Sequence, residues 1–219
     1  MNAALLVLTK APVPGRSKTR LSPPCTPEQA AAIAGAAVAD TLDAVRAVPV
    51  ARRVVALDGS PGGLDLSGFD VVEQVDGDLG IRLAAAFAAA MTPAIPTLLI
   101  GMDTPQVTPA LLTDCLTRLL DAGPATAVLG AAPDGGWWAL GLHSPDPARV
   151  LPTVPMSRDD TGTRTRAALE KTGLSVLDLP ELTDVDHFAE ALAVAAACPV
   201  DSRTRRVVAE IAATLEGSP

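Results

Sequence analysis

Residues 3–21 read A-A-L-L-V-L-T-K-A-P-V-P-G-R-S-K-T-R-L, and they decide the fold expected for the whole chain. The first part, Ala3 to Leu8, is a short and continuous apolar run, which predicts a fully buried strand. The prolines and the glycine that follow predict a loop at the carboxyl end of that strand. Loops in this position of an open α/β sheet are where such folds bind ligands.

The predicted loop is crowded with positive charge from Lys10, Arg16, Lys18 and Arg20. The chain has no Asp or Glu before Glu28, so these cations have no partner close in sequence. The formal net charge of the protein is −8, which makes a cluster of positive charge more informative. We predict that the loop binds an anion, of which polyphosphate is the commonest at such a place. The alternative is a solvated basic turn.

Short apolar runs predict further strands at 53–58, 70–75, 97–100, 125–129, 137–142 and 175–179. Alanine-rich or amphipathic segments predict helices at 27–48, 81–91, 110–121, 160–171, 187–197 and 203–215. The first of these helices follows Thr26-Pro27-Glu28-Gln29, which supplies an N-cap, a proline at the first position and a capping-box Gln. Strands that alternate with helices predict a mostly parallel sheet in a three-layer α/β/α sandwich.

The composition excludes several classes of protein. Apolar residues make up 48% of the 219 residues but aromatic residues only 2%, so the core must be built from Ala, Leu and Val. The negative net charge disfavours nucleic-acid binding, because a phosphate backbone would be repelled. Three cysteines far apart in sequence predict reduced thiols in a cytoplasmic protein. The N-terminal apolar run is too short to span a bilayer, and no membrane association is predicted.

We predict one domain over 1–219, present as a monomer or a homodimer, because the sequence shows neither a repeat nor a low-complexity linker. The proline-rich stretch Ser144 to Pro155 predicts a change from a nucleotide-binding half to an acceptor half. The first half spans about 1–143 and the second about 144–200, and a C-terminal helix follows over 201–219.

Familiar catalytic motifs do not fit the chain. G-R-S-K-T at 15–19 is close to the end of a Walker A motif, but Ser17 stands where that motif needs Gly. The sequence has no G-x-G-x-x-G, which disfavours a Rossmann dinucleotide site, and no G-x-S-x-G. Its two histidines, His143 and His187, do not stand at metal-ligand spacing. Hydrolase triads and histidine-based zinc sites are therefore disfavoured.

Candidate carboxylates occur in two places, one after the predicted strand at 97–100 and the other before the predicted helix at 187–197. Asp103, in G-M-D-T-P, ends the strand at 97–100 and is the best candidate for holding Mg²⁺ against substrate phosphates. A turn or cap role is the alternative, although Thr108 already caps the next helix. In Asp184-Val185-Asp186 the two carboxylates share a face if the segment is extended, so Asp186, or less favourably Asp184, is the second candidate ligand. An N-cap role for Asp186 is the simpler alternative.

Two further loops are informative. Arg82 lies in the first turn of a predicted helix, which is the wrong end for a cation unless a phosphate or a base offsets the cost; a solvated surface is the alternative.

In D-G-G-W-W at 134–138 consecutive tryptophans face opposite sides of a strand, so one packs in the core and the other lines an acceptor pocket. The predicted acceptor-binding residues are Asp134, Gly135, Trp138 and Ser157.

Taken together, K-A-P-V-P-G-R-S-K-T-R-L, D-L-G-I-R-L, G-M-D-T-P, P-D-G-G-W-W-A-L-G-L and D-V-D-H-F resemble a bacterial family of the GT-A, or nucleotide-diphospho-sugar transferase, fold. Its members are called DUF2064 or GT-A-type glycosyltransferases, and some are assigned to arsenosugar biosynthesis. The resemblance runs from about Leu5 to Leu192. More distantly the chain is similar to 2-phospholactate guanylyltransferase and to the molybdenum-cofactor nucleotidyltransferases.

The resemblance implies a phosphate-binding loop, a metal-binding Asp103 and, with less support, Asp186 as second ligand of Mg²⁺ or Mn²⁺. It maps Lys10, Arg16, Lys18 and Arg20 onto that loop. We predict nucleotide contacts from Lys10, Gly15, Arg16, Lys18, Gly80 and Arg82, and catalytic roles for Lys18, Arg20 and Asp103. Two positions depart from the family: Met156 stands where relatives often have Trp, and His187 where they often have Thr.

Three functions are consistent with these features. The first is nucleotidyl transfer from an NTP to a small phosphorylated or hydroxyl acceptor with release of pyrophosphate, since four unpaired cations suit a triphosphate. The second is glycosyl transfer from a nucleotide sugar. The third is a catalytically silent nucleotide-binding module. The D-x-P form of Gly101 to Pro105 favours the first, because glycosyltransferases of this fold more often have D-x-D there.

Overall fold

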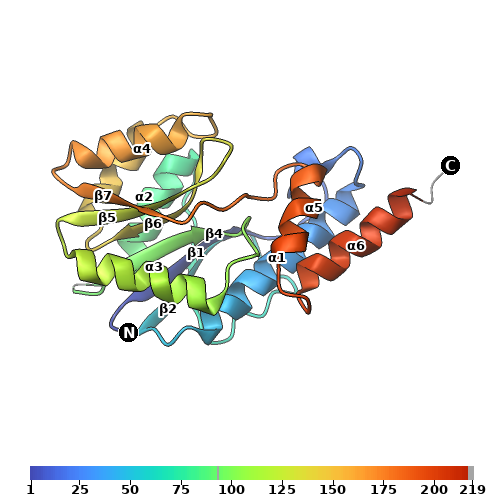
Figure 1. The fold of residues 1–219 in the computed structure, drawn as a ribbon, viewed down its shortest axis with the longest axis horizontal. Helices are drawn as coiled ribbons and strands as arrows, with labels where there is room; N and C mark the ends of the chain where they lie inside the picture. The colour runs from blue at the N-terminus through green and yellow to red at the C-terminus, as the bar shows by residue number, and fades with distance from the viewer. Residues whose placement is uncertain (93, 217–219) are drawn as a thin grey trace.

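The computed structural model describes residues 1–92 and 94–216 and contains a seven-stranded sheet with helices on both faces (Figure 1). Its strand order is β3-β2-β1-β4-β6-β5-β7. β6 runs antiparallel to β4 and β5, and the other neighbouring strands are parallel. The sheet is therefore mostly parallel, as the sequence predicts, although the antiparallel strand was not predicted. The strands are β1 (Ala4–Lys10), β2 (Arg52–Asp58), β3 (Asp70–Glu73), β4 (Thr97–Gly101), β5 (Thr126–Ala131), β6 (Trp137–Leu142) and β7 (Ser175–Leu179).

The helices complete a three-layer sandwich, which confirms the predicted architecture. α1 and α3 pack on one face of the sheet, and α2 and α4 with the short helix η2 pack on the other. All the predicted helices and strands are present with ends within two residues, whereas η1 and η2 were not predicted. The helices are α1 (Pro27–Ala47), α2 (Leu79–Ala90), α3 (Pro109–Ala122), α4 (Thr161–Glu170), α5 (Phe188–Ala197), α6 (Arg203–Glu216), η1 (Thr19–Leu21) and η2 (Asp146–Thr153). Of the C-terminal helix predicted over 201–219, residues 217–219 lie outside the described residues.

Two helices begin at the caps that the sequence predicts. The Thr26 hydroxyl accepts a hydrogen bond from the Gln29 amide at 3.2 Å, and the Gln29 side chain accepts one from the Thr26 amide at 2.8 Å. The Thr108 hydroxyl accepts from the Leu111 amide at 3.1 Å and starts α3. Because Thr108 serves as this cap, Asp103 is not needed for it.

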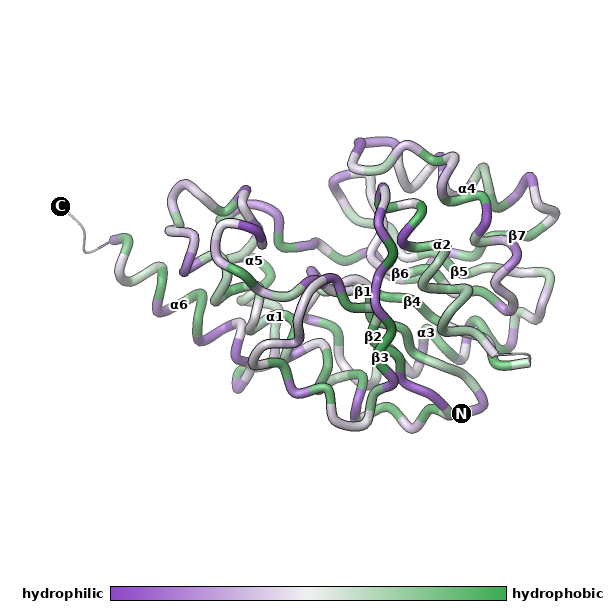
Figure 2. Tube along the Cα trace, turned by 180° about the vertical axis from the view of Figure 1, so that it is seen from behind, coloured by the Kyte–Doolittle hydropathy of each residue, from purple (hydrophilic) through white to green (hydrophobic). Residues whose placement is uncertain are grey.

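The core consists mainly of Ala, Leu and Val, as predicted. β1 is buried on both faces: Leu5 and Val7 pack toward α1, while Leu6 packs toward Phe87 of α2. Figure 2 shows hydrophobic residues along the central strands and hydrophilic ones in several of the loops that join them. A separate cluster joins α5 and α6 to α1, beside the sheet (Figure 1).

The three cysteines are free thiols and are buried, in agreement with the predicted reduced state. Burial raises the pKa of Cys115 to about 12 and that of Cys198 to about 11, so both thiols are protonated at neutral pH. Within residues 1–92 and 94–216, the helices lack the combination of length and apolar composition that a membrane crossing requires.

The strand register brings the two most informative loops together. Leu8 of β1 pairs with Gly101 of β4, and Lys10 at the end of β1 pairs with Asp58 at the end of β2. The chain leaves β1 toward β2 on one side, whereas β4 lies on the other side. This point of the sheet is a topological switch point, where open α/β sheets bind ligands.

Candidate functional site

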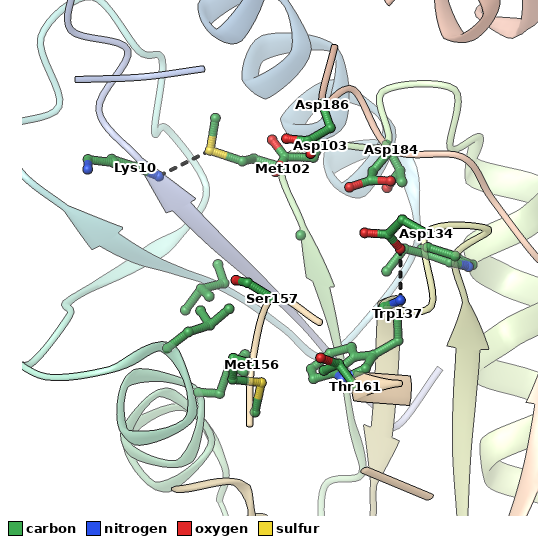
Figure 3. Close-up of a pocket in the computed structure, with 18 of the residues that line it drawn as sticks. Lys10, Met102, Asp103, Asp134, Trp137, Met156, Ser157, Thr161, Asp184 and Asp186 are labelled. Carbon is green, nitrogen blue, oxygen red and sulfur yellow. Dashed lines mark hydrogen bonds between the residues drawn. The ribbon is translucent and has the colours of Figure 1, made fainter. Parts of the chain in front are cut away.

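A cavity of about 640 Å³ opens at the carboxyl ends of β1 and β4. Its wall comes from the loop after β1, the loop after β4, the turn before β6, the loop before α4 and the segment before α5. The structure thus gathers most of the predicted site residues around one cavity, and Figure 3 labels Lys10, Asp103, Asp134, Ser157 and Asp186 among them. They are Lys10, Arg16, Lys18, Arg20, Arg82, Asp103, Asp134, Trp138, Ser157 and Asp186.

Three predicted glycines lie outside this lining. Gly15 is exposed, with φ +72°. A Cβ at Gly80 would lie 2.4 Å from the Leu151 carbonyl oxygen, because α2 packs closely on η2 there. A Cβ at Gly135 would lie 1.8 Å from the carbonyl oxygen of Asp159. Gly80 and Gly135 therefore permit close backbone packing, and the predicted ligand contacts of all three stay predictions.

The expectation that the loop cations lack partners is wrong for three of the four. Lys18 Nζ lies 2.9 Å from Asp103 Oδ1, and Arg20 Nη1 lies 2.6 Å from Asp186 Oδ2. Lys10 Nζ lies 3.9 Å from an oxygen of Asp58. Parallel strands place their carboxyl ends at one edge of the sheet, so carboxylates distant in sequence meet the loop there. Among the described residues, Arg16 alone of the four has no ion pair.

Lys18 connects three segments of the chain. Its side chain is only 10% exposed and donates to the Val185 carbonyl as well as pairing with Asp103. The Val185 amide in turn donates to the Asp103 carbonyl at 2.8 Å. Lys18 (φ +49°) and Ser157 (φ +58°) are two of the three non-glycine residues with positive φ in the described chain, and both line the cavity. Such backbone strain often occurs at functional sites.

Ser17 gives the loop after β1 its shape. The buried Ser17 hydroxyl donates to the Ala11 carbonyl at 2.8 Å and accepts from the Val13 amide at 3.1 Å. These bonds close the loop at the position where a Walker A motif would have Gly. The loop is therefore organised by a side chain, which explains its departure from that motif.

Sequence reasoning missed the polar residues that hold Arg82. Arg82 Nη1 lies 3.1 Å from Asp58 Oδ2 and 3.3 Å from Gln74 Oε1. Gln74 also donates to the carbonyls of Thr9 and Ala56, both at 2.8 Å. The negative charge of Asp58 thus compensates for the unfavourable interaction between Arg82 and the N-terminal end of the helix dipole. The available signal was the place of Asp58 as the last residue of a strand.

Met102 is a further site residue that the sequence did not indicate. Its sulfur accepts hydrogen bonds from the Thr9 hydroxyl and the Lys10 amide, both at 3.3 Å (Figure 3). The side chain therefore connects the ends of β1 and β4 beneath the loops that carry Lys18 and Asp103.

Five aspartates line the cavity, namely Asp103, Asp134, Asp159, Asp184 and Asp186, and Figure 3 labels all of them except Asp159. Val185 is fully buried, so its two neighbours share the opposite face, as predicted. The N-cap of α5 is His187, which removes that alternative role for Asp186. Burial raises the pKa of Asp184, and the nearby carboxylates of Asp134 and Asp103 raise it further.

Asp103 has the donor chemistry for a hard divalent cation. Its Oδ1 is buried and accepts no well-aligned hydrogen bond from the described residues, although it lies beside Lys18 Nζ. Within the described ranges, His, Cys, Asp and Glu form no group of three that could hold a metal ion. Mg²⁺ is usually bound by one or two carboxylates together with substrate phosphates. The residues therefore fit a cation shared with a nucleotide rather than one held by protein alone.

The two tryptophans differ in burial, and the more buried one is Trp138, which the sequence predicts to contact the acceptor. Trp138 lines the cavity but is only 3% exposed, packs in the core, and donates to the Pro180 carbonyl at 2.9 Å. Trp137 is half-buried, lines the cavity and donates to the Thr165 hydroxyl at 3.1 Å. Alternation predicted one buried and one lining tryptophan, but it could not tell which was which.

Comparison with protein families finds that the family described as "Uncharacterized protein conserved in bacteria (DUF2064)" matches residues 41–158. Comparison with curated proteins finds no match. A solved structure from Desulfovibrio desulfuricans G20, named as a "putative nucleotide-diphospho-sugar transferase", is 22% identical with a TM-score of 0.85, covering 99% of this chain and 97% of that one.

Two more distant structures share the fold. Rv0371c from Mycobacterium tuberculosis H37Rv is 25% identical with a TM-score of 0.55, covering 87% of this chain and 96% of its own. The 2-C-methyl-D-erythritol 4-phosphate cytidylyltransferase from Thermus thermophilus is 19% identical with a TM-score of 0.55, covering 90% of this chain and 99% of its own. These likenesses confirm the nucleotide-diphospho-sugar transferase fold that the sequence predicts.

Proposed function

The chain belongs to the DUF2064 family, and we propose that it is a transferase that uses a nucleotide donor and Mg²⁺ or Mn²⁺. One observation carries the proposal: Lys18 and Asp103 meet at 2.9 Å where β1 and β4 end side by side. A cation-rich loop suits phosphates, and a carboxylate opposite it suits the cation that accompanies them. Structures that share the fold are named as a "putative nucleotide-diphospho-sugar transferase" and as a cytidylyltransferase, which supports the same class.

In the proposed reaction Lys10 and Arg16 bind the donor phosphates. Lys18 and Arg20 exchange their carboxylate partners for phosphate oxygens and stabilise the negative charge that develops during transfer. Asp103 and Asp186 would hold the divalent cation, which neutralises phosphate charge when it is bound. The ion pairs seen here keep the same groups ordered before substrate arrives.

The acceptor attacks from the side of the cavity formed by Asp134, Trp137 and Ser157. In nucleotidyl transfer, an acceptor oxygen forms a bond to the α-phosphorus, and the bond from that phosphorus to pyrophosphate breaks. A hydroxyl acceptor also loses its proton to water. We propose that residues 1–219 act as one domain, in which about 1–143 provide most donor contacts and about 144–200 complete the acceptor side.

Glycosyl transfer from a nucleotide sugar is the second candidate. Three of the four loop cations already have carboxylate partners, which leaves less free positive charge for a triphosphate than the sequence indicated. A nucleotide sugar carries about two negative charges on two phosphates, so it needs fewer fixed cations. Nucleotidyl transfer remains first because Asp103 stands in D-x-P rather than D-x-D.

The two reactions release different products. We expect incubation with each NTP, Mg²⁺ and a panel of hydroxyl and phosphorylated acceptors to release pyrophosphate. Release of a free nucleoside diphosphate from a nucleotide sugar, with no pyrophosphate from any NTP, would establish glycosyl transfer instead. Failure of every nucleotide to bind would contradict both.

Lys18→Met should weaken nucleotide binding by about 1.5 to 3 kcal/mol, the range for a hydrogen bond to a charged group. This corresponds to a roughly 10- to 150-fold higher Kd, measured by calorimetric titration with an NTP and with a nucleotide sugar. The matched control is Lys171→Met, because Lys171 is exposed at the end of α4 outside the cavity lining. Equal weakening in both variants would show that overall charge, rather than this site, governs binding.

A further inference from the structure

The acceptor side of the cavity has an apolar floor. Trp137 of β6 and Met156 from the loop before α4 line the cavity and belong to one hydrophobic cluster. Leu79 and Leu83, which flank the predicted nucleotide contact Arg82 in α2, line the cavity as well and belong to the same cluster. In Figure 3, Met156 and Trp137 lie at the end of the cavity farther from Asp103. A ligand that reaches from Asp103 toward this floor leaves the polar donor side and meets apolar side chains.

The floor is held in place before any ligand binds. Trp137 uses its only polar atom to donate to the buried Thr165 hydroxyl, so what it offers the cavity is its ring surface. The Thr161 hydroxyl donates to the Pro155 carbonyl and accepts from the Arg158 amide, both at 3.0 Å. These two bonds bracket Met156 and hold its loop against the start of α4.

The rim above the floor is acidic. Asp134, Asp159 and Asp184 line this side and have no ion pair among the described residues. Arg20 lies near Asp134 and Asp184 but is paired with Asp186, so that pair adds no net charge, and Arg158 is the remaining cation here. Three negative charges against one positive charge leave the rim at about −2 when all are ionised. A phosphorylated acceptor would therefore be repelled, while hydroxyl or ammonium donors would find acceptors in Asp134 and Asp184.

We propose that the acceptor is an alcohol or amine without phosphate, carrying an apolar body that rests on Trp137 and Met156. This inference rests on the proposed function and narrows its acceptor class. Trp137 and Met156 then determine specificity, because they contact the part of the acceptor that does not react. Asp134 discriminates against anionic acceptors through its charge.

Three probes share one apolar body and differ in charge: 2-phenylethanol, 2-phenylethylamine and 2-phenylethyl phosphate. The chain has two tryptophans and no tyrosine, so intrinsic fluorescence comes from Trp137 and the buried Trp138 alone. With Mg²⁺ and an NTP present, we expect the alcohol and the amine to cause a saturable change and to bind at least about tenfold more tightly than the phosphate.

Substitutions test whether Trp137, Met156 and Asp134 cause the fluorescence change and the preference among the probes. Trp137→Phe should remove the fluorescence change, and Met156→Ala should raise the Kd of the alcohol about threefold or more. Asp134→Asn should reduce the discrimination against the phosphate. Leu177→Ala, on the exposed face of edge strand β7, is the control that should leave all three Kd values unchanged.

Phosphate binding as tight as alcohol binding, or no saturable change with any probe, overturns the inference. Calorimetry of the same samples with an NTP and a nucleotide sugar separates the two proposals. Nucleotide binding without probe binding overturns the acceptor class alone. Probe binding without binding of any nucleotide overturns the proposed function.

Discussion

We expect replacement of Asp103 by Asn to abolish cation-dependent nucleotide binding and turnover, because Asp103 is the carboxylate that meets the phosphate-binding loop where β1 and β4 end. Asn keeps the size of the side chain but loses the negative charge that a divalent cation requires. The free energy of unfolding should fall by only about 1 to 2 kcal/mol, because Asp103 is 38% exposed and Lys18 keeps its bond to the Val185 carbonyl. Calorimetric titration of an NTP with and without Mg²⁺ measures the binding loss, and urea unfolding measures stability.

Asp114→Asn is the matched control for this charge change. Asp114 forms an exposed ion pair with Arg118 at 2.9 Å on α3, outside the cavity lining. Its replacement should leave nucleotide affinity and its Mg²⁺ dependence unchanged. If Asp103→Asn binds nucleotide with the same affinity and the same response to Mg²⁺ as the parent, Asp103 does not belong to the donor site.

The architecture could be predicted because local signals were strong. The buried run in β1, the capping box at Thr26 and the cap at Thr108 each specify an element through contacts within a few residues. The site region followed from one rule, since loops after neighbouring parallel strands meet at one edge of the sheet. This rule was enough to predict that Lys18 and Asp103 lie close together, although the register between β1 and β4 was not known.

Pairings across the sheet could not be predicted in the same way. The partners of Lys18 and Arg20 lie 85 and 166 residues further along the chain, at Asp103 and Asp186. Because no carboxylate lies close to these cations in sequence, the sequence alone predicted that they are unpaired. Likewise, alternation shows that Trp137 and Trp138 face opposite sides, but it does not show which side each one faces. In the structure Trp138 packs in the cluster with α1 and α3, and Trp137 packs against the cluster with α2 and α4.

The two glycines of D-G-G-W-W take part in a backbone contact with a distant segment, and the sequence did not predict this contact. The predicted turn at Gly135 is present, and its acceptor contact stays a prediction. The structure also shows this turn packed backbone to backbone against the start of α4 and the residues before it, which the sequence did not predict. The Gly162 amide donates to the Gly135 carbonyl at 2.7 Å, and a Cβ at Gly162 would lie 2.8 Å from the Gly136 carbonyl oxygen. This packing joins the turn that carries Asp134 to the loop that carries Ser157.

Gly135→Ala should lower the free energy of unfolding by about 2 to 5 kcal/mol. The backbone has φ +86°, which costs an L-residue about 1 to 2 kcal/mol, and overpacking against the Asp159 carbonyl at 1.8 Å adds about 1 to 3 kcal/mol. Urea unfolding measures the loss. The two loops must separate to admit the methyl group, so binding of the acceptor probes should weaken more than nucleotide binding.

Gly173→Ala separates the two causes. Gly173 has a similar φ of +93°, but a Cβ there would meet nothing within 4 Å, so this variant carries the backbone cost alone, about 1 to 2 kcal/mol. The difference between the two variants measures the clash between the loops. A loss at Gly135 no larger than that at Gly173, with probe binding intact, would show that the acceptor wall does not depend on this packing.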